Sequence, residues 1–367
     1  MTNSPRATPV WSYARSGVDR SAVARALDAL RSAIAVRPGP GHGRRVGPMG
    51  HYAGLVRLGR EVVALTTDSV GTKTLLAERV GWFEPIGEDA VAVNANDVAA
   101  VGARMAGVVD VINCRRPDPA VFAAIGRGIS RGLRRSGGHL LGGETAVVPD
   151  LVQGIDVGGT ALGFFPAGRH PILGESIRPG DLVLGAASHG VHANGMTLVR
   201  RLVDEAGVDL ASPRPGGGRR PVGRELLRPT RIYNPLVESI AGVPGVHGLA
   251  HISGGGVRNL VRLHAGVRFR LDGWPMPAGL FAWIQSLGNV SAAEMAETFN
   301  LGIGFVVVVD PRARARVVAR ARRAGFADLA EVGRVERGTG VHLPRLGITF
   351  EGYGEGAPRP EPGAAPA

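Results

Sequence analysis

Cysteine is almost absent from this chain of 367 residues, which contains only Cys114. A single thiol excludes an internal disulfide and any zinc site built from several cysteines. This composition fits a reducing compartment, and we expect a cytoplasmic protein. Cys114 follows the apolar run 109–112, so we interpret it as a packed residue at the end of a strand rather than as a nucleophile.

Long apolar runs and aromatic residues are also scarce. No stretch approaches the about 18 uninterrupted apolar residues of a membrane span, and the first 20 residues contain no apolar segment typical of a signal peptide. Aromatic residues make up 5% of the chain, and the arginines behind its net charge of +12 are scattered. These features argue against a membrane protein and against nucleic-acid binding, whereas the positive charge suits a small anionic substrate.

Lysine is the third scarce residue, because Lys73 is the only one among 43 lysines and arginines. It ends the motif T-D-S-V-G-T-K, Thr67–Lys73, which follows the apolar run 62–65 and precedes a helical turn predicted at 74–79. Lysine places a compact charge on a flexible stem, which suits contact with a phosphoryl group. The alternative is a surface lysine left by chance in an arginine-biased chain.

The chain is long enough for two domains of ordinary size. A Pro- and Gly-containing stretch at 166–179 predicts the boundary between an N-terminal domain, 13–170, and a C-terminal domain, 171–350. Residues 1–12 are expected to be mobile and 351–367 to form a disordered tail. The Gly- and Pro-rich stretch 37–50 is either a linker or a flexible flap over an anion.

Apolar periodicity predicts helices and strands that alternate along the chain. In the first half we expect helices at 21–34, 86–103 and 118–136, and strands at 62–65, 107–113, 139–141 and 156–165. In the second half we expect strands at 181–187, 302–310, 329–334 and 341–350, and helices at 194–203, 228–240, 257–264, 291–299 and 312–324.

Polar residues interrupt these elements at a few positions. Asn94 and Asp97 share one face of an apolar helix, where a carboxylate needs a cation or another partner unless it faces solvent. Glu144 is expected just past a strand end, behind Gly142 and Gly143. The loops 188–195, S-H-G-V-H-A-N-G, and 250–256, A-H-I-S-G-G-G, lie at strand-to-helix junctions that suit an anion.

Seven segments of the chain resemble those of the aminoimidazole ribonucleotide synthetase family, also called phosphoribosylformylglycinamidine cyclo-ligases. They occur in the family's order and cover roughly residues 12–345. The segments are T-D-S-V-G-T-K, N-D-V-A-A-V-G-A, G-G-E-T, H-A-N-G-M-T-L-V-R, P-T-R-I-Y, A-H-I-S-G-G-G and E-M-A-E-T-F-N-L-G-I-G.

The resemblance implies two α/β domains, with the N-terminal domain forming a β-barrel shared across a homodimer and the C-terminal domain packed outside it. It implies an ATP- and Mg²⁺-dependent ring closure of formylglycinamidine ribonucleotide to aminoimidazole ribonucleotide, in purine biosynthesis. In this reaction the formyl oxygen of the substrate is phosphorylated, and a substrate nitrogen then displaces the phosphate. The partners that the resemblance implies are a small phosphorylated substrate and a second subunit.

The resemblance also assigns site residues. The metal ligands are expected to be Asp68, Asp97 and Glu144. The catalytic residues are expected to be Asp68, Lys73, His192 and Asn194. ATP and its phosphates are expected to contact Gly71, Thr72, Lys73, Asp97, Gly142, Gly143 and Glu144. The substrate is expected to contact His192, Asn194, Gly254, Gly255 and Gly256.

Two features depart from the family's pattern. Met105 follows Gly102-Ala103-Arg104 where a proline is common, and the flap carries arginines in place of a lysine. Related families of the same architecture are selenophosphate synthetases, hydrogenase-maturation proteins and thiamine-phosphate kinases. The first two carry a reactive cysteine near one terminus, which this chain lacks. A thiamine-phosphate-kinase-like enzyme and a catalytically silent nucleotide-binding relative stay open as alternatives.

Overall fold

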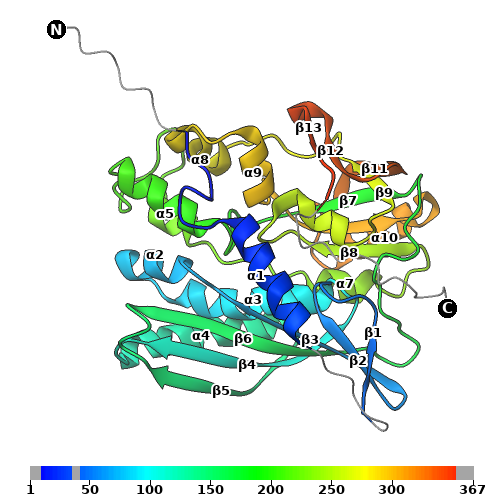
Figure 1. Cartoon of the computed structure of the whole chain (residues 1–367), viewed down its shortest axis with the longest axis horizontal. Coiled ribbons are helices and arrows are strands. Elements are labelled where there is room, and N and C mark those ends of the chain that lie inside the picture. Colours follow the sequence, from blue (N-terminus) through cyan, green and yellow to red (C-terminus); the bar gives the residue numbers. More distant parts are fainter. Residues whose placement is uncertain (1–9, 35–41, 353–367) are drawn as a thin grey trace, which may run out of the picture.

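The structure is a computed structural model that describes residues 10–34 and 42–352 (Figure 1). The predictions for residues 1–9, for the start of the flap at 37–41 and for the tail at 353–367 lie outside the described residues. Two sheets with accompanying helices make up the described chain, as the predicted α/β class requires. Within the described residues no helix is both long and apolar enough to cross a membrane.

The first sheet has the strand order β1-β2-β3-β6-β4-β5. Neighbouring strands in this sheet run antiparallel, except β4 and β5, which run parallel and are joined by a helix. The strands are β1 (Arg44–Val46), β2 (Gly54–Leu58), β3 (Glu61–Ser69), β4 (Arg104–Cys114), β5 (His139–Val147) and β6 (Ile155–Phe164).

One face of this sheet packs against helix α3 (Glu84–Ala99), which is almost completely buried. Its alanines and valines let it lie between the first sheet and the second half of the chain, where it contacts α7 (Asn234–Ile240) and β8 (Val246–His251). The other helices of the first half are α1 (Arg20–Ala33), α2 (Lys73–Val80) and α4 (Pro119–Ser136). Helix α3 is therefore the element that joins the two halves.

The second sheet has the strand order β13-β12-β9-β11-β7-β10-β8. Its strand β10 is buried at every position, and only β12 and β9 are parallel neighbours. Besides β8, the strands are β7 (Leu182–Ala187), β9 (Val267–Arg270), β10 (Ile303–Val309), β11 (Ala330–Arg337), β12 (Gly340–Leu343) and β13 (Ile348–Phe350). Besides α7, its helices are α5 (Met196–Glu205), α6 (Val222–Leu226), α8 (Leu280–Gly288), α9 (Ala292–Thr298) and α10 (Arg314–Arg323), with 3₁₀ turns η1 (Gly256–Arg262), η2 (Pro311–Ala313) and η3 (Pro344–Leu346).

Several predicted elements differ from the structure. The helix expected at 257–264 is the 3₁₀ turn η1, and the strand expected at 341–350 is divided into β12 and β13 by η3. Strand β3 continues to Ser69, so Asp68 lies within it, and β5 continues to Val147, so Glu144 lies inside a strand rather than past its end. A register shift beside Val108 and a left-handed Gly142 allow β5 to continue. The helix predicted at 228–240 begins only at Asn234, because the backbone before it bonds to side chains of α3 instead.

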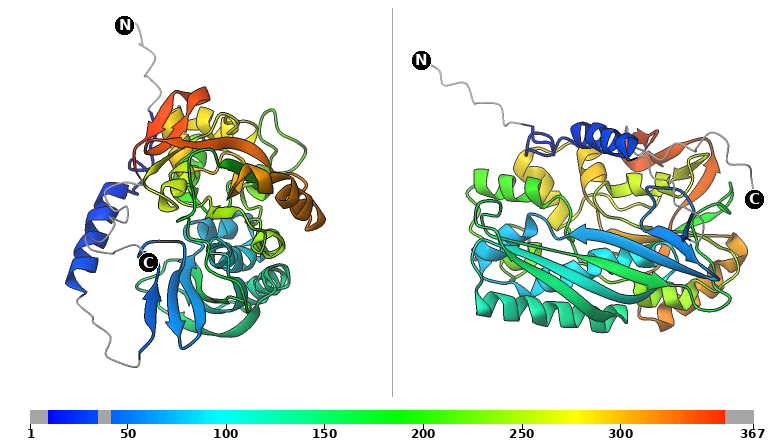
Figure 2. Two further views of the ribbon diagram at one scale, coloured as in Figure 1. Left: turned by 90° about the vertical axis from the view of Figure 1, so that its right-hand side faces the viewer. Right: turned by 60° about the horizontal axis from the view of Figure 1, so that its bottom comes forward.

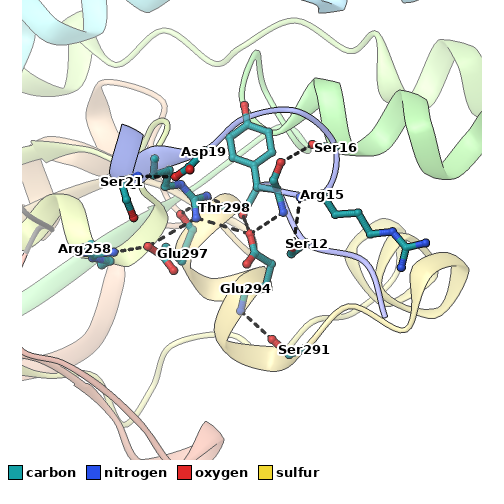
Figure 3. A network of polar contacts seen from close by, with 12 residues as sticks. Ser12, Arg15, Ser16, Asp19, Ser21, Arg258, Ser291, Glu294, Glu297 and Thr298 are labelled. Carbon is teal, nitrogen blue, oxygen red and sulfur yellow. Dashed lines mark hydrogen bonds and ion pairs between the residues drawn. The ribbon is translucent and has the colours of Figure 1, made fainter. Parts of the chain in front are cut away.

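The N-terminal segment before α1 is attached to the second half of the chain (Figure 3). The Trp11 backbone N–H donates to the Gly288 carbonyl at 3.0 Å. The backbone N–H of Tyr13 donates to Glu294 Oε1 at 3.1 Å, and Arg20 donates to Thr298 Oγ1 at 2.7 Å. These contacts fix the start of α1 against α9. The prediction that residues 1–12 are mobile is therefore wrong for residues 11 and 12, which are anchored by the Trp11 hydrogen bond.

Candidate active site

Most of the predicted site residues lie where the first half of the chain, which forms the first sheet, packs against the second half, which forms the second sheet. We call this boundary the seam. Thr72 Oγ1, just before α2, lies 2.9 Å from Thr197 Oγ1 in the first turn of α5. A Cβ atom built on Gly254 would lie 3.2 Å from Asn194 Oδ1. The T-D-S-V-G-T-K segment, the 188–195 loop and the glycine turn 254–256 are thus neighbours in space. Sequence order alone did not show this arrangement.

Asp68 and Asp97 are the carboxylates that the structure brings together. Asp68 lies on β3 and Asp97 on α3, and Asn94 of α3 donates to the Asp68 carbonyl at 3.2 Å. The Asp68 residue as a whole is exposed, but loss of hydration around its carboxylate, followed by the charge of Asp97, raises its pKa to about 6. The two negative groups therefore repel one another and favour a cation between them.

His251 is a partner of Asp97 that the sequence did not identify. Its Nδ1 donates to Asp97 Oδ1 at 2.9 Å, and the imidazole is buried at the end of β8. This contact supplies the partner that a carboxylate in an apolar helix requires. The segment A-H-I-S-G-G-G contains the histidine, but the prediction used only its glycines. The sequence did contain a signal for this pair, because His251 lies at the end of a strand and Asp97 is a carboxylate without an identified partner in an apolar helix.

The fit of Mg²⁺ depends on these carboxylates. Mg²⁺ is commonly held by one or two carboxylates together with the phosphates of a substrate, and Asp68 and Asp97 provide two. Glu144 does not join them. It lies on the edge strand β5, opposite Val111 of β4, and β5 is three strand spacings or roughly 14 Å from β3. Among the residues that the structure describes, no group of three His, Cys, Asp or Glu side chains could hold a metal. The predicted three-carboxylate cluster is therefore not formed within one chain.

Lys73 differs most from its prediction. Its side chain is completely buried, with Nζ 2.6 Å from Asp89 Oδ2 and donating to the Arg228 carbonyl at 2.9 Å. An ammonium that has lost its water and is paired with a buried carboxylate is not presented to a phosphate on the surface. Asp89, which the sequence analysis missed, is also completely buried and accepts from the Thr230 backbone N–H. Its only signal was a carboxylate inside an apolar helix.

His192 is also buried rather than open to a ligand. It adopts a left-handed backbone conformation with φ of 62°, and its Nε2 accepts from the backbone N–H groups of His189 at 3.1 Å and Arg231 at 3.4 Å. Burial, and then the nearby imidazole of His251, hold the pKa of His192 well below its usual value. His192 is therefore neutral at pH 7 and orders its own loop, whereas Asn194 is partly exposed beside Gly254.

The predicted glycines fall into two locations. Gly71 and Gly256 adopt left-handed conformations with φ of 64° and 53°, and a Cβ on Gly256 would overlap the Ala296 carbonyl oxygen of α9. Gly254, Gly255 and Gly256 thus form a tight turn against α9 at the seam. Gly142 and Gly143 lie with Glu144 on β5, at the far edge of the first sheet.

Comparison with known proteins covers most of the chain. The model for the AIR synthase related protein, N-terminal domain, matches residues 50–165, and that for the AIR synthase related protein, C-terminal domain, matches residues 178–344. The phosphoribosylformylglycinamidine cyclo-ligase of Pyrococcus furiosus is 40% identical over 344 residues, which is 92% of this chain and 99% of that protein. That of Methanothermobacter thermautotrophicus is 44% identical over 264 residues, 71% of this chain and 77% of its own length.

Solved structures share the fold at lower identity. The structure of AaThiL complexed with AMPPCP and TMP has a TM-score of 0.60 at 18% identity and covers 84% of this chain and 92% of its own. Escherichia coli HypE has a TM-score of 0.57 at 22% identity, with coverage of 79% and 84%. The chain therefore belongs to the AIR synthase related family and, within it, to the phosphoribosylformylglycinamidine cyclo-ligases.

Proposed function

We propose that this chain catalyses the ATP-dependent ring closure of formylglycinamidine ribonucleotide to aminoimidazole ribonucleotide, releasing ADP and phosphate in purine biosynthesis in the cytoplasm. The observation that carries the proposal is the 40% identity to a cyclo-ligase across 99% of that relative's length. The seam supports it, because it holds a carboxylate pair beside two glycine turns that suit anions.

Asp68 and Asp97 are the residues that would hold Mg²⁺ and, with it, the phosphates of ATP. The bound ion would neutralise charge on the phosphates as the γ-phosphoryl group is transferred. His251 keeps the Asp97 carboxylate oriented through its 2.9 Å hydrogen bond, and Asn94 fixes the backbone of Asp68. Gly71 and Thr72 would lie against the phosphates, because a left-handed glycine at the start of α2 leaves backbone N–H groups accessible.

The substrate would lie on the other side of the seam. Asn194 and the glycine turn 254–256 are the partly exposed polar features there, and the turn suits the ribose phosphate. His192 acts through its loop, because its imidazole is fully buried and its Nε2 is occupied by two backbone donors. Contacts of the substrate with Asn194 and with the turn 254–256 would hold its attacking nitrogen near the activated carbon.

An assay of ATP consumption tests this function. With formylglycinamidine ribonucleotide as substrate, we expect ADP, phosphate and the aromatic product to form in equal amounts. Thiamine phosphate is the second substrate to test, since a related phosphotransferase would consume ATP with it and release no inorganic phosphate. Turnover with thiamine phosphate but not with formylglycinamidine ribonucleotide would overturn the proposal in favour of a kinase. No turnover with either substrate would favour a catalytically silent relative.

We also propose that the active form is a homodimer built on the first sheet. Helices cover one face of that sheet, and among the described residues none covers the other, which faces the viewer at the right of Figure 2. The uncovered face carries exposed apolar side chains, including Leu65 at 52% and Val109 at 40% exposure. Val23, Leu27 and Leu30 of helix α1, with Ile34 directly after it, form a second exposed apolar stripe. Apolar surfaces of this kind are typical of an interface between subunits.

A barrel shared by two such sheets would cover this face and remove the free edge of β5. Glu144 lies on that edge strand, opposite Val111. We therefore assign the predicted binding role of Glu144, with Gly142 and Gly143, to the dimer interface rather than to the Asp68 and Asp97 pair of the same chain.

Leu65→Asp is expected to convert the dimer to a monomer, because a carboxylate would be buried without a partner at the centre of the interface. Light scattering during gel filtration should show the mass falling from twice 38.1 kDa to 38.1 kDa. Met276→Asp is the control, since Met276 is 38% exposed on the second half of the chain. A wild-type monomer, or a Leu65→Asp dimer, would contradict the proposed interface.

A further inference from the structure

The segment Arg228–Asn234 lies between α6 and α7 of the second half and packs against the first half, and it forms no helix until Asn234. Its backbone is held by side chains from the first half. The Arg228 carbonyl accepts from Lys73, the Thr230 N–H donates to Asp89 Oδ1 at 2.7 Å, and Asn96 bonds to the backbone of both Arg231 and Tyr233 at 2.9 Å. Side chains of α2 and α3 thus replace the hydrogen bonds that a helix would have supplied.

Lys73 and Asp89 form the centre of this attachment. Both side chains have no exposed surface, and Nζ lies 2.6 Å from Oδ2. Each charge then has one further contact, to a backbone atom of the segment 228–230. Removing one partner of a buried ion pair leaves the other charge uncompensated, whereas neutralising both is tolerated far better. The pair therefore determines where this segment lies.

The segment in turn supports the loop that faces the substrate side of the seam. The Arg231 N–H donates to His192 Nε2 at 3.4 Å, and the Arg231 guanidinium bonds to the Ala187 carbonyl at 2.9 Å, at the end of β7. His192 is held in its left-handed conformation in the loop that ends at Asn194. A chain of direct contacts thus leads from Lys73, through Arg228–Arg231 and His192, to the loop that carries Asn194.

We propose that Lys73 is a positioning residue: with Asp89 it holds the segment 228–231 so that the 188–195 loop presents Asn194 to the substrate. The inference rests on the proposed function for its substrate and deepens it. It also replaces the expected contact between Lys73 and phosphate. The T-D-S-V-G-T-K motif then serves both sides of the seam, since Asp68 would hold the metal and Lys73 holds the loop 188–195.

The test compares Lys73→Met, Asp89→Asn and the double variant Lys73→Met/Asp89→Asn in the full chain. The readouts are kcat and KM for formylglycinamidine ribonucleotide, the Kd of MgATP by titration calorimetry, and amide exchange at Thr230 and Arg231. Arg79→Met is the matched control, because Arg79 also pairs across the two halves, with Asp204, but both side chains are exposed.

We expect Lys73→Met to lower kcat/KM by about 100-fold, the scale of a misplacement of about 1 Å, with the Kd of MgATP unchanged. Asp89→Asn should behave similarly, and the exchange at Thr230 and Arg231 should accelerate in both. The double variant should recover most of the activity and slow the exchange again, because the introduced amide oxygen can still accept from Thr230 and no buried charge is left. Arg79→Met should match the wild type.

A double variant no better than Lys73→Met, or a loss of MgATP affinity that accompanies the loss of turnover, would overturn the positioning role and favour a direct phosphate contact. Exchange at Thr230 and Arg231 needs no substrate. A wild type without cyclo-ligase turnover would therefore contradict the proposed function, while unchanged exchange in Lys73→Met and Asp89→Asn would separately contradict the positioning role.

Discussion

Asp97→Asn is expected to lower turnover by about a hundredfold or more, a loss typical of removing one group that stabilises charge at the reacting centre. The carboxylate lies near Asp68 at the seam and is oriented by His251. An amide keeps the shape of the side chain but removes the negative charge that a divalent cation requires. The asparagine variant should therefore fold and fail to use Mg²⁺ at ordinary concentrations.

A magnesium titration at saturating ATP measures this effect. The midpoint should move to higher Mg²⁺ in Asp97→Asn and also in Asp68→Asn. Asp150→Asn serves as the control, because Asp150 is exposed in the turn between β5 and β6. An unchanged midpoint together with normal turnover in both active-site variants would remove the carboxylate pair from the mechanism.

Gly128→Ala is expected to lower the free energy of unfolding by about 3 kcal/mol, at the upper end of the usual cost of overpacking. Gly128 of α4 and Gly87 of α3 lie where the two helices cross. A Cβ atom on Gly128 would overlap the Glu84 carbonyl oxygen, and one on Gly87 would overlap the Ile125 carbonyl oxygen. Backbone atoms of a buried helix cannot move aside locally, so the whole crossing would have to separate.

Gly126→Ala provides a control in the same helix. It lies on the exposed side of α4, where a Cβ would meet nothing within 4 Å, so the higher helix propensity of alanine should stabilise the fold by up to about 1 kcal/mol. Denaturant unfolding of both variants measures the difference. Equal stability of Gly128→Ala and the wild type would mean that α3 and α4 do not approach as closely as the structure shows.

Sequence periodicity predicted most elements because their apolar patterns are local. Helix α1 was expected at 21–34 and is found at Arg20–Ala33, and the helix expected at 118–136 is α4, with Asp118 accepting from the N–H groups of its first turn. The same approach failed for 228–233, where Thr230 and Tyr233 use side chains from a distant helix as backbone partners. Long-range contacts of that kind leave no periodic signal.

The site was predictable to a similar extent. The family resemblance assigned site roles to Asp68, Asp97, Asn194 and the glycine turn 254–256, which the structure brings to one seam. It did not reveal that Lys73 and His192 face inward, because burial depends on the packing of two halves that are distant in sequence. Nor did it identify Asp89 or His251, since the need for each becomes visible only once its partner is located.

The most direct test of the central claim follows the oxygen that ring closure removes. Nitrogen displaces a formyl oxygen poorly unless that oxygen is first phosphorylated, and we propose that the carboxylate pair at the seam would hold the MgATP that supplies the phosphoryl group. Substrate carrying oxygen-18 at the formyl position should therefore transfer its label to inorganic phosphate, one atom for each ring closed. Ring closure with the label found only in water would contradict the phosphorylated intermediate and the account built on it.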